Sequence, residues 1–172
     1  MRRGFTIVEL LIIIIVMGIL LTLTFVNLSS SQVNARDSER KADIESIALA
    51  FETGVKNPHT TENEFLETGN YPGEITMNIA LPDNITTLLP DIDPKALRAP
   101  GVSESSPVSL VLATNDIQTA TGVLPAPTIN TYVYQPIDNL GGLCEDACGK
   151  FNLYYRLEAD NTVYMLTSKH QQ

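Results

Sequence analysis

The sequence predicts an α+β fold, in which a long N-terminal α-helix packs on a small antiparallel β-sheet head and the first half of the helix crosses a membrane. Three observations predict this fold. Every residue from Leu10 to Leu21 is apolar or glycine. No proline occurs before Pro58. After residue 131 the chain alternates apolar and polar residues and is rich in tyrosine and valine, a pattern typical of strands that cover one face of a helix.

The predicted membrane span is residues 5–28. A helix needs about 20 apolar residues to cross a bilayer, and this run is long enough. Arg2 and Arg3 precede it, and the next basic residue is Arg36. Because positively charged flanks stay in the cytoplasm, we expect a single-pass protein of the cytoplasmic membrane with its N-terminus inside and its C-terminus outside. The run is longer than the core of a secretory signal peptide, and no small-residue cleavage site follows it.

One acid, Glu9, interrupts the start of the apolar run. Inserting an acid at the membrane centre costs roughly 2.5–3.5 kcal/mol, and less near the interface. An acid in such a segment is therefore expected to have a partner. The stretch Gly4–Leu11, behind its two arginines, resembles the processing motif of type IV prepilins and type II secretion pseudopilins. The resemblance implies that residues 1–4 are a leader cut after Gly4 by a prepilin peptidase. It also implies that the new N-terminal Phe5 is N-methylated and that Glu9 serves filament assembly.

Two partners are open to Glu9. Cleavage would give Phe5 a free amine, which is positive at neutral pH. Glu9 lies four residues further on, about 6 Å along a helix. A buried acid is tolerable when it is paired with an opposite charge, and the resemblance points to the amine of a neighbouring subunit's Phe5. Alternatively, Glu9 extends to the lipid headgroups.

Residues 29–56 are predicted to continue the helix with an amphipathic pattern. Opposite charges three or four residues apart, such as Asp37–Lys41 and Arg40–Asp43, are expected on its solvated side. The helix should end near residues 54–58, which contain glycine and proline. The apolar positions recur with helical spacing and predict one buried face: Ile44, Ile47, Ala48, Phe51 and Val55.

The head is predicted in two parts. Residues 57–130 form a loop-rich αβ region with a strand at residues 108–113, because proline, glycine, asparagine and aspartate are frequent there. Residues 131–172 form antiparallel strands, with a hairpin loop at residues 159–161. We expect three or four antiparallel strands packed on the apolar helix face, with the tyrosines of this region in the core or on a sheet face.

Cys144 and Cys148 are the only cysteines. Outside the cytoplasm a disulfide is the favoured interpretation, closing a small ring in one loop. A two-cysteine metal site and free or redox-active thiols are the alternatives.

Four polar residues bracket the cysteine loop: Asp138, Asn139, Glu145 and Asp146. Some pseudopilins bind calcium in a loop between C-terminal strands, so the resemblance makes these residues candidate calcium ligands. Their spacing does not match an EF-hand, and a plain polar loop is the alternative. We therefore expect no cofactor, with calcium as the one candidate.

The charge of the chain limits its partners. The formal net charge is −9, and removing the leader arginines leaves nine basic against 20 acidic side chains. Nucleic acid would require a basic face, so it is not an expected partner. His59 and His170 stand apart from any nucleophile motif, and we expect no enzyme activity.

The resemblance implies a structural subunit of a type IV pilus-like filament. Its partners would be copies of itself or other pilins, the prepilin peptidase and the pilus or secretion assembly machinery. The assembled protein would lie on the cell surface or in the periplasm. A type II secretion pseudopilin and a non-polymerising, membrane-tethered extracytoplasmic binding module are the alternatives.

Overall fold

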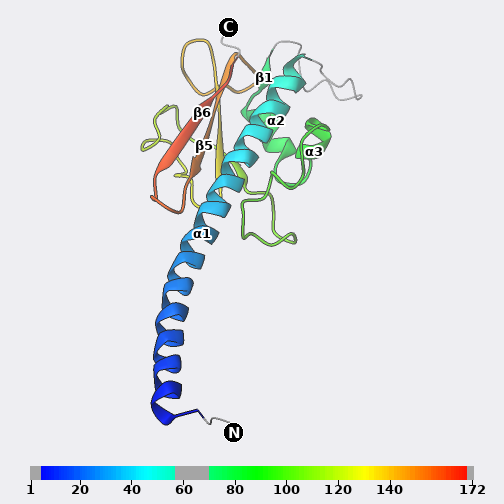
Figure 1. The fold of residues 1–172 in the computed structure, drawn as a ribbon. Helices are drawn as coiled ribbons and strands as arrows, with labels where there is room; N and C mark the ends of the chain where they lie inside the picture. The colour runs from blue at the N-terminus through cyan, green and yellow to red at the C-terminus, as the bar shows by residue number, and fades with distance from the viewer. Residues whose placement is uncertain (1–4, 57–69, 170–172) are drawn as a thin grey trace.

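The computed structural model describes residues 5–56 and 70–169. Its longest element is α1, a helix of 50 residues (Ile7–Lys56). At 1.5 Å per residue this helix is about 75 Å long. Figure 1 shows the N-terminal half of α1 extending away from the molecule while the C-terminal half lies across the head. The helix ends within the range that its glycine and the following proline predicted.

The head contains two short helices and six strands within the described ranges. β1 and β4 form an antiparallel pair, and the other four strands form one sheet in the order β2-β3-β5-β6. In chain order the elements are β1 (Tyr71–Pro72), α2 (Glu74–Ala80), α3 (Ile85–Leu88), β2 (Leu110–Leu112), β3 (Tyr132–Ile137), β4 (Ala147–Cys148), β5 (Lys150–Arg156) and β6 (Val163–Thr167).

The four-stranded sheet is mixed, which corrects the expectation of an antiparallel sheet. β3, β5 and β6 are antiparallel neighbours, as predicted. β2 instead pairs with β3 in parallel, with Leu110 opposite Tyr132. A parallel pair needs a long crossover connection, because the second strand must start at the same end as the first. Residues 113–131 make this crossover without a regular element of their own.

The predicted apolar face of α1 is the centre of the core. All five of its residues are buried against the sheet and the segments around β1 and α2. The ring of Phe51 stacks on that of Tyr134 with 4.6 Å between centroids, and the Phe151 ring lies 5.4 Å away. Burying one such side chain contributes about 1.5–3 kcal/mol, so this face firmly fixes the helix to the head.

The other face of the sheet is covered by the crossover loop. Val133 and Tyr154 form a small second core there. Gln135 lies between them and the loop, where its amide donates to the carbonyls of Asn115 (2.8 Å) and Ile117 (3.2 Å). The Tyr154 hydroxyl donates to the Gln135 side-chain oxygen at 2.7 Å. β3 is therefore buried on both faces.

Candidate functional site

The N-terminal half of α1 exposes apolar side chains around its whole circumference. The large apolar residues from Ile7 to Leu23 are 40–85% exposed. None of the residues in the most apolar stretch of this helix is buried. Within residues 5–56 and 70–169, α1 is the one helix long and apolar enough to cross a membrane. Because this part of α1 has no polar face, its apolar side chains can be removed from water only by an apolar environment that surrounds the helix on all sides.

The first turn of α1 is closed by a capping box. The Thr6 backbone N–H donates to Oε2 of Glu9 at 3.3 Å, and the Thr6 hydroxyl donates to the same oxygen at 3.2 Å. The Glu9 N–H in turn donates to the Thr6 hydroxyl oxygen at 3.3 Å. This reciprocal arrangement is the one that a Thr-x-x-Glu sequence makes at a helix start. Glu9 thus has an intrahelical partner that was not predicted, although the Thr-x-x-Glu spacing signals it.

The predicted processing residues lie at the free end of this helix. Phe5 immediately precedes the capping box and is exposed, as is Glu9. Gly4 and the rest of the predicted leader lie outside the described residues. The structure brings Phe5, Thr6 and Glu9 together within one turn, far from the head (Figure 1).

The outward side of the rest of α1 carries a stripe of small uncharged residues and one leucine, beside the exposed Lys41 and Glu45. Positions three or four apart share one helical face. The residues of this face are all exposed or half-exposed: Ser31, Ala35, Ser38, Ala42, Ser46, Leu49 and Thr53. They leave the backbone of α1 accessible to close approach along the part of the helix that lies on the head.

Charged residues join α1 to the head where the helix leaves it. Arg40 is only 1% exposed, and its guanidinium donates to Asp37 (2.8 Å) and to the carbonyl of Ile129 (3.0 Å). Asp37 also accepts the backbone N–H of Glu158 at 2.8 Å. The expectation that these helix charges lie on the solvated side is therefore wrong for Asp37 and Arg40. They are buried because the β5–β6 loop folds over them.

Arg36 and Glu158 complete this junction. The Arg36 guanidinium donates to both carboxylate oxygens of Glu158, at 2.8 and 2.6 Å. This forked geometry is the strongest form of such a pair. It raises the pKa of Arg36 and lowers that of Glu158. We call Arg36, Asp37, Arg40 and Glu158 the clasp.

Asp43 lies one turn beyond the clasp and is also buried, at 7% exposure, again contrary to expectation. The Tyr132 hydroxyl donates to its carboxylate at 2.9 Å. Burial raises the pKa of Asp43 to about 6, while the Tyr132 hydrogen bond acts in the opposite direction. Burial and the Asp43 charge likewise raise the pKa of Tyr132. The pair joins α1 to β3 at the cost of a poorly solvated carboxylate.

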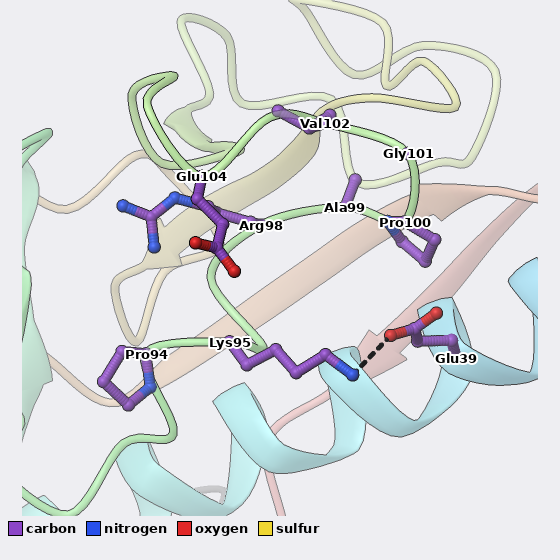
Figure 2. A pocket seen from close by; sticks show the side chains of 9 residues that line it. All are labelled: Glu39, Pro94, Lys95, Arg98, Ala99, Pro100, Gly101, Val102 and Glu104. Atoms are coloured by element: carbon purple, nitrogen blue, oxygen red, sulfur yellow. Dashed lines mark ion pairs between the residues drawn. The ribbon is translucent and has the colours of Figure 1, made fainter.

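An open cavity of about 470 Å³ lies beside this part of α1 (Figure 2). Lys95 extends across it to Glu39 on the helix, with 2.9 Å between Nζ and Oε1. Arg98 and Glu104 line the opposite side, so the charges around the cavity are mixed. Since Lys95 is 79% exposed, solvent screens this ion pair and it contributes little to the stability of the head.

Cys144 and Cys148 form the favoured disulfide, with Cα atoms 5.7 Å apart. The loop that it closes docks on the first turn of α2. The N–H groups of Glu74 and Ile75 donate to the carbonyls of Cys144 and Glu145, both at 2.9 Å. The disulfide loop therefore holds the start of α2 against the C-terminal half of the head.

The four calcium candidates do not converge in the structure. Asp138 folds its own loop, since its Oδ1 accepts the N–H groups of Leu140 and Gly142, both at 2.8 Å. Asn139, Glu145 and Asp146 are exposed. Within the described ranges no three acidic, histidine or cysteine side chains are grouped to hold a metal ion.

Comparisons of the chain with protein-family models, with curated proteins and with solved structures find no match.

Proposed function

We propose that this chain is a structural subunit of a type IV pilus-like filament, held first in the cytoplasmic membrane by α1 and then polymerised through the exposed part of that helix. The observation that carries the proposal is the apolar circumference of residues 7–23. A helix that is apolar on all sides is stable inside a bilayer or inside a bundle of similar helices. A filament subunit uses both environments in turn.

Two further features support a subunit rather than a plain anchor. The Gly4–Leu11 motif supplies a processing site and an acid inside the apolar run, and an anchor has no use for either. The small outward face of α1 allows close helix packing to continue beyond the apolar half. In this proposal the N-terminus is cytoplasmic, and the acidic heads coat the filament surface.

The test is N-terminal peptide mass spectrometry on the membrane fraction and on material sheared from the cell surface. The proposal expects a chain beginning at N-methylated Phe5, present in the sheared fraction as filaments. A chain that keeps Met1–Gly4 and occurs only in membranes would refute it and leave a tethered binding module. Filaments that remain in the periplasm and are absent from the sheared fraction would assign the chain to a secretion pseudopilus.

A further inference from the structure

β6 is an edge strand of the four-stranded sheet, and alternate residues of it have unpaired backbone groups. The ladder with β5 is fixed by the N–H of Ser168, which donates to the Phe151 carbonyl at 2.9 Å, and by that of Leu157, which donates to the Thr162 carbonyl at 3.0 Å. In an antiparallel ladder the residues between such pairs point their N–H and C=O groups away from the neighbouring strand. Within the described residues these outward groups have no hydrogen-bond partner. They belong to Val163, Met165 and Thr167.

This edge lacks the features that usually keep sheet edges apart. Residues 161–168 include no charged residue, proline or glycine. Native edge strands are usually guarded by lysines, prolines or bulges, because their free backbone groups can pair with a second strand. Charges stand only at the two ends, with Asp160 before the strand and Lys169 after it, and both are exposed. In a protein with a net charge of −9, an uncharged edge is a surface on which two copies can approach without strong repulsion.

We propose that the β6 edge pairs with the β6 edge of a second copy of this chain, antiparallel and with Met165 opposite Met165 of that copy. In this register Val163 of each copy lies opposite Thr167 of the other. Every outward N–H and C=O group of the strand then gains a partner, and the two four-stranded sheets become one continuous sheet.

The charges at the ends of β6 favour the antiparallel arrangement. The register places Lys169 of each copy opposite Asn161 of the other, and therefore next to Asp160 of that copy. A parallel arrangement would instead bring each charge beside the same charge of the second copy, which is destabilising.

A cavity on the α1 side of the edge fits the same register. It has a volume of about 380 Å³ and lies open between α1 and the end of β6, with an apolar lining that includes Ala48, Leu49 and Leu166. Residues that face each other across two strands lie on one face of the sheet, and Leu166 would face Tyr164 of the second copy. The Tyr164 ring, 38% exposed in the single chain, would thus lie against the cavity of the other copy.

The pairing reverses the direction of α1 between the two copies. β6 runs along α1 in the same direction, because Ala159 before it donates its N–H to Asp37 (2.9 Å) and Lys169 after it donates its N–H to Glu52 (2.7 Å). Figure 1 shows the two elements side by side. Copies in one membrane insert in one orientation, so they cannot pair in this way. The pairing does not depend on the proposed function, but in the proposed filament it would join two filaments that run in opposite directions.

Disulfide cross-linking of the full chain in detergent micelles tests the pairing and its register. Met165→Cys should cross-link with itself, because hydrogen-bonded facing residues have Cα atoms about 5.5 Å apart, within the range of a disulfide. Val163→Cys and Thr167→Cys should each remain uncross-linked alone and cross-link when mixed. Leu140→Cys, at a position 97% exposed on another loop, measures random collision. The native cysteines are bonded to each other and do not interfere.

A proline at the centre of the edge tests the role of the backbone. Met165→Pro removes one outward N–H and keeps the ladder with β5, since proline is tolerated on an edge strand where its nitrogen faces solvent. Placed in both the Val163→Cys and the Thr167→Cys chain, it should lower the yield of the mixed cross-link about tenfold, as expected for the loss of two backbone hydrogen bonds. Met165→Ala keeps the N–H and should lower the yield much less. The urea midpoint shows whether the proline variant is folded, and the Met165→Cys result stands without it.

The results that would overturn the pairing are distinct from those that would refute the filament. Met165→Cys cross-linking no faster than Leu140→Cys would overturn it, and Val163→Cys cross-linking with itself would overturn the antiparallel register. Equal yields with Met165→Pro and Met165→Ala would exclude the backbone edge from the contact. None of these measurements requires a filament, whereas the proposed function is decided by N-terminal processing and by the sheared fraction.

Discussion

Replacing the buried Asp43 with asparagine is expected to stabilise the head at neutral pH. Above its pKa of about 6 the carboxylate is ionised while only 7% exposed. The rise in the pKa of Asp43 from its ordinary value of 3.8 corresponds to a cost of about 3 kcal/mol to the folded state. The asparagine would keep the shape and still accept the Tyr132 hydroxyl through its amide oxygen. We therefore expect Asp43→Asn to raise the free energy of unfolding by up to about 3 kcal/mol at pH 7.

The sign of the pH dependence follows from the raised pKa of Asp43. The folded state binds the Asp43 proton more tightly than the unfolded state, so this group lowers stability fully above pH 6 and not at all below pH 4. As the pH falls from about 6 to about 4, the wild type should approach Asp43→Asn in stability. The carboxyls with lowered pKa, those of Glu158 and Asp160, lose their stabilising effect at still lower pH, but they do so in both proteins.

The assay is urea unfolding of the full chain in detergent micelles from pH 7.5 to pH 4, followed by near-ultraviolet circular dichroism of the tyrosines. Tyr132→Phe is the matched control: it leaves Asp43 buried without its donor and should destabilise the head by about 1–3 kcal/mol at pH 7. The reasoning fails if Asp43→Asn is less stable than the wild type at pH 7. It fails equally if the difference between the two is the same at pH 4 as at pH 7.

Further substitutions test the junction and the head. Arg40→Met should cost about 3–5 kcal/mol in urea unfolding, because it leaves the buried Asp37 carboxylate without its cation, whereas Arg36→Met at the half-exposed end of the clasp should cost much less. Gly73→Ala should cost about 1–3 kcal/mol or more, since its Cβ would overlap the backbone of the disulfide loop at Glu145 and Asp146; an unchanged urea midpoint would contradict the docking of that loop. Replacing Cys144 and Cys148 with alanine should cost about 2 kcal/mol, the low end expected for so small a ring, and added reductant should reproduce the loss in the wild type.

The sequence was most informative where one periodic signal dominated. The helical spacing of Ile44, Ile47 and Phe51 predicted the buried face of α1, and all three are buried. The β5–β6 hairpin was also predicted, because two strand-like runs flank a short polar loop in which Asn161 adopts a positive φ. Both elements depend on contacts close in sequence or on a single repeated spacing, which a sequence displays directly.

Contacts between distant residues were not visible in the same way. Nothing near Leu110 indicates that β2 runs parallel to a strand more than 20 residues later. Likewise, Asp37 and Arg40 look like an ordinary solvated pair until the loop containing Glu158 covers them.

The capping box at Thr6 and Glu9 was missed for a different reason. The Thr-x-x-Glu spacing is present in the sequence. However, an acid within an apolar membrane-spanning segment first suggests a partner outside its own helix. The hydrogen bonds to Thr6 show that an intrahelical partner exists, and they do not use both oxygens of the acid.

The clasp lies between the exposed part of α1 and the part whose apolar face is covered by the head. From Ile7 to Leu23 the helix is apolar and exposed, residues 29–35 are mostly polar, and from Ile44 onward the apolar face of the helix is covered by the sheet. An apolar contact at the junction would have extended the exposed apolar surface into the head and left its register along the helix weakly defined. Forked and buried charge pairs have strict geometry, so they fix the hairpin loop at one position on α1. The head is therefore held at one position on the helix, and in the proposed filament the packing of the exposed helices would determine where each head lies.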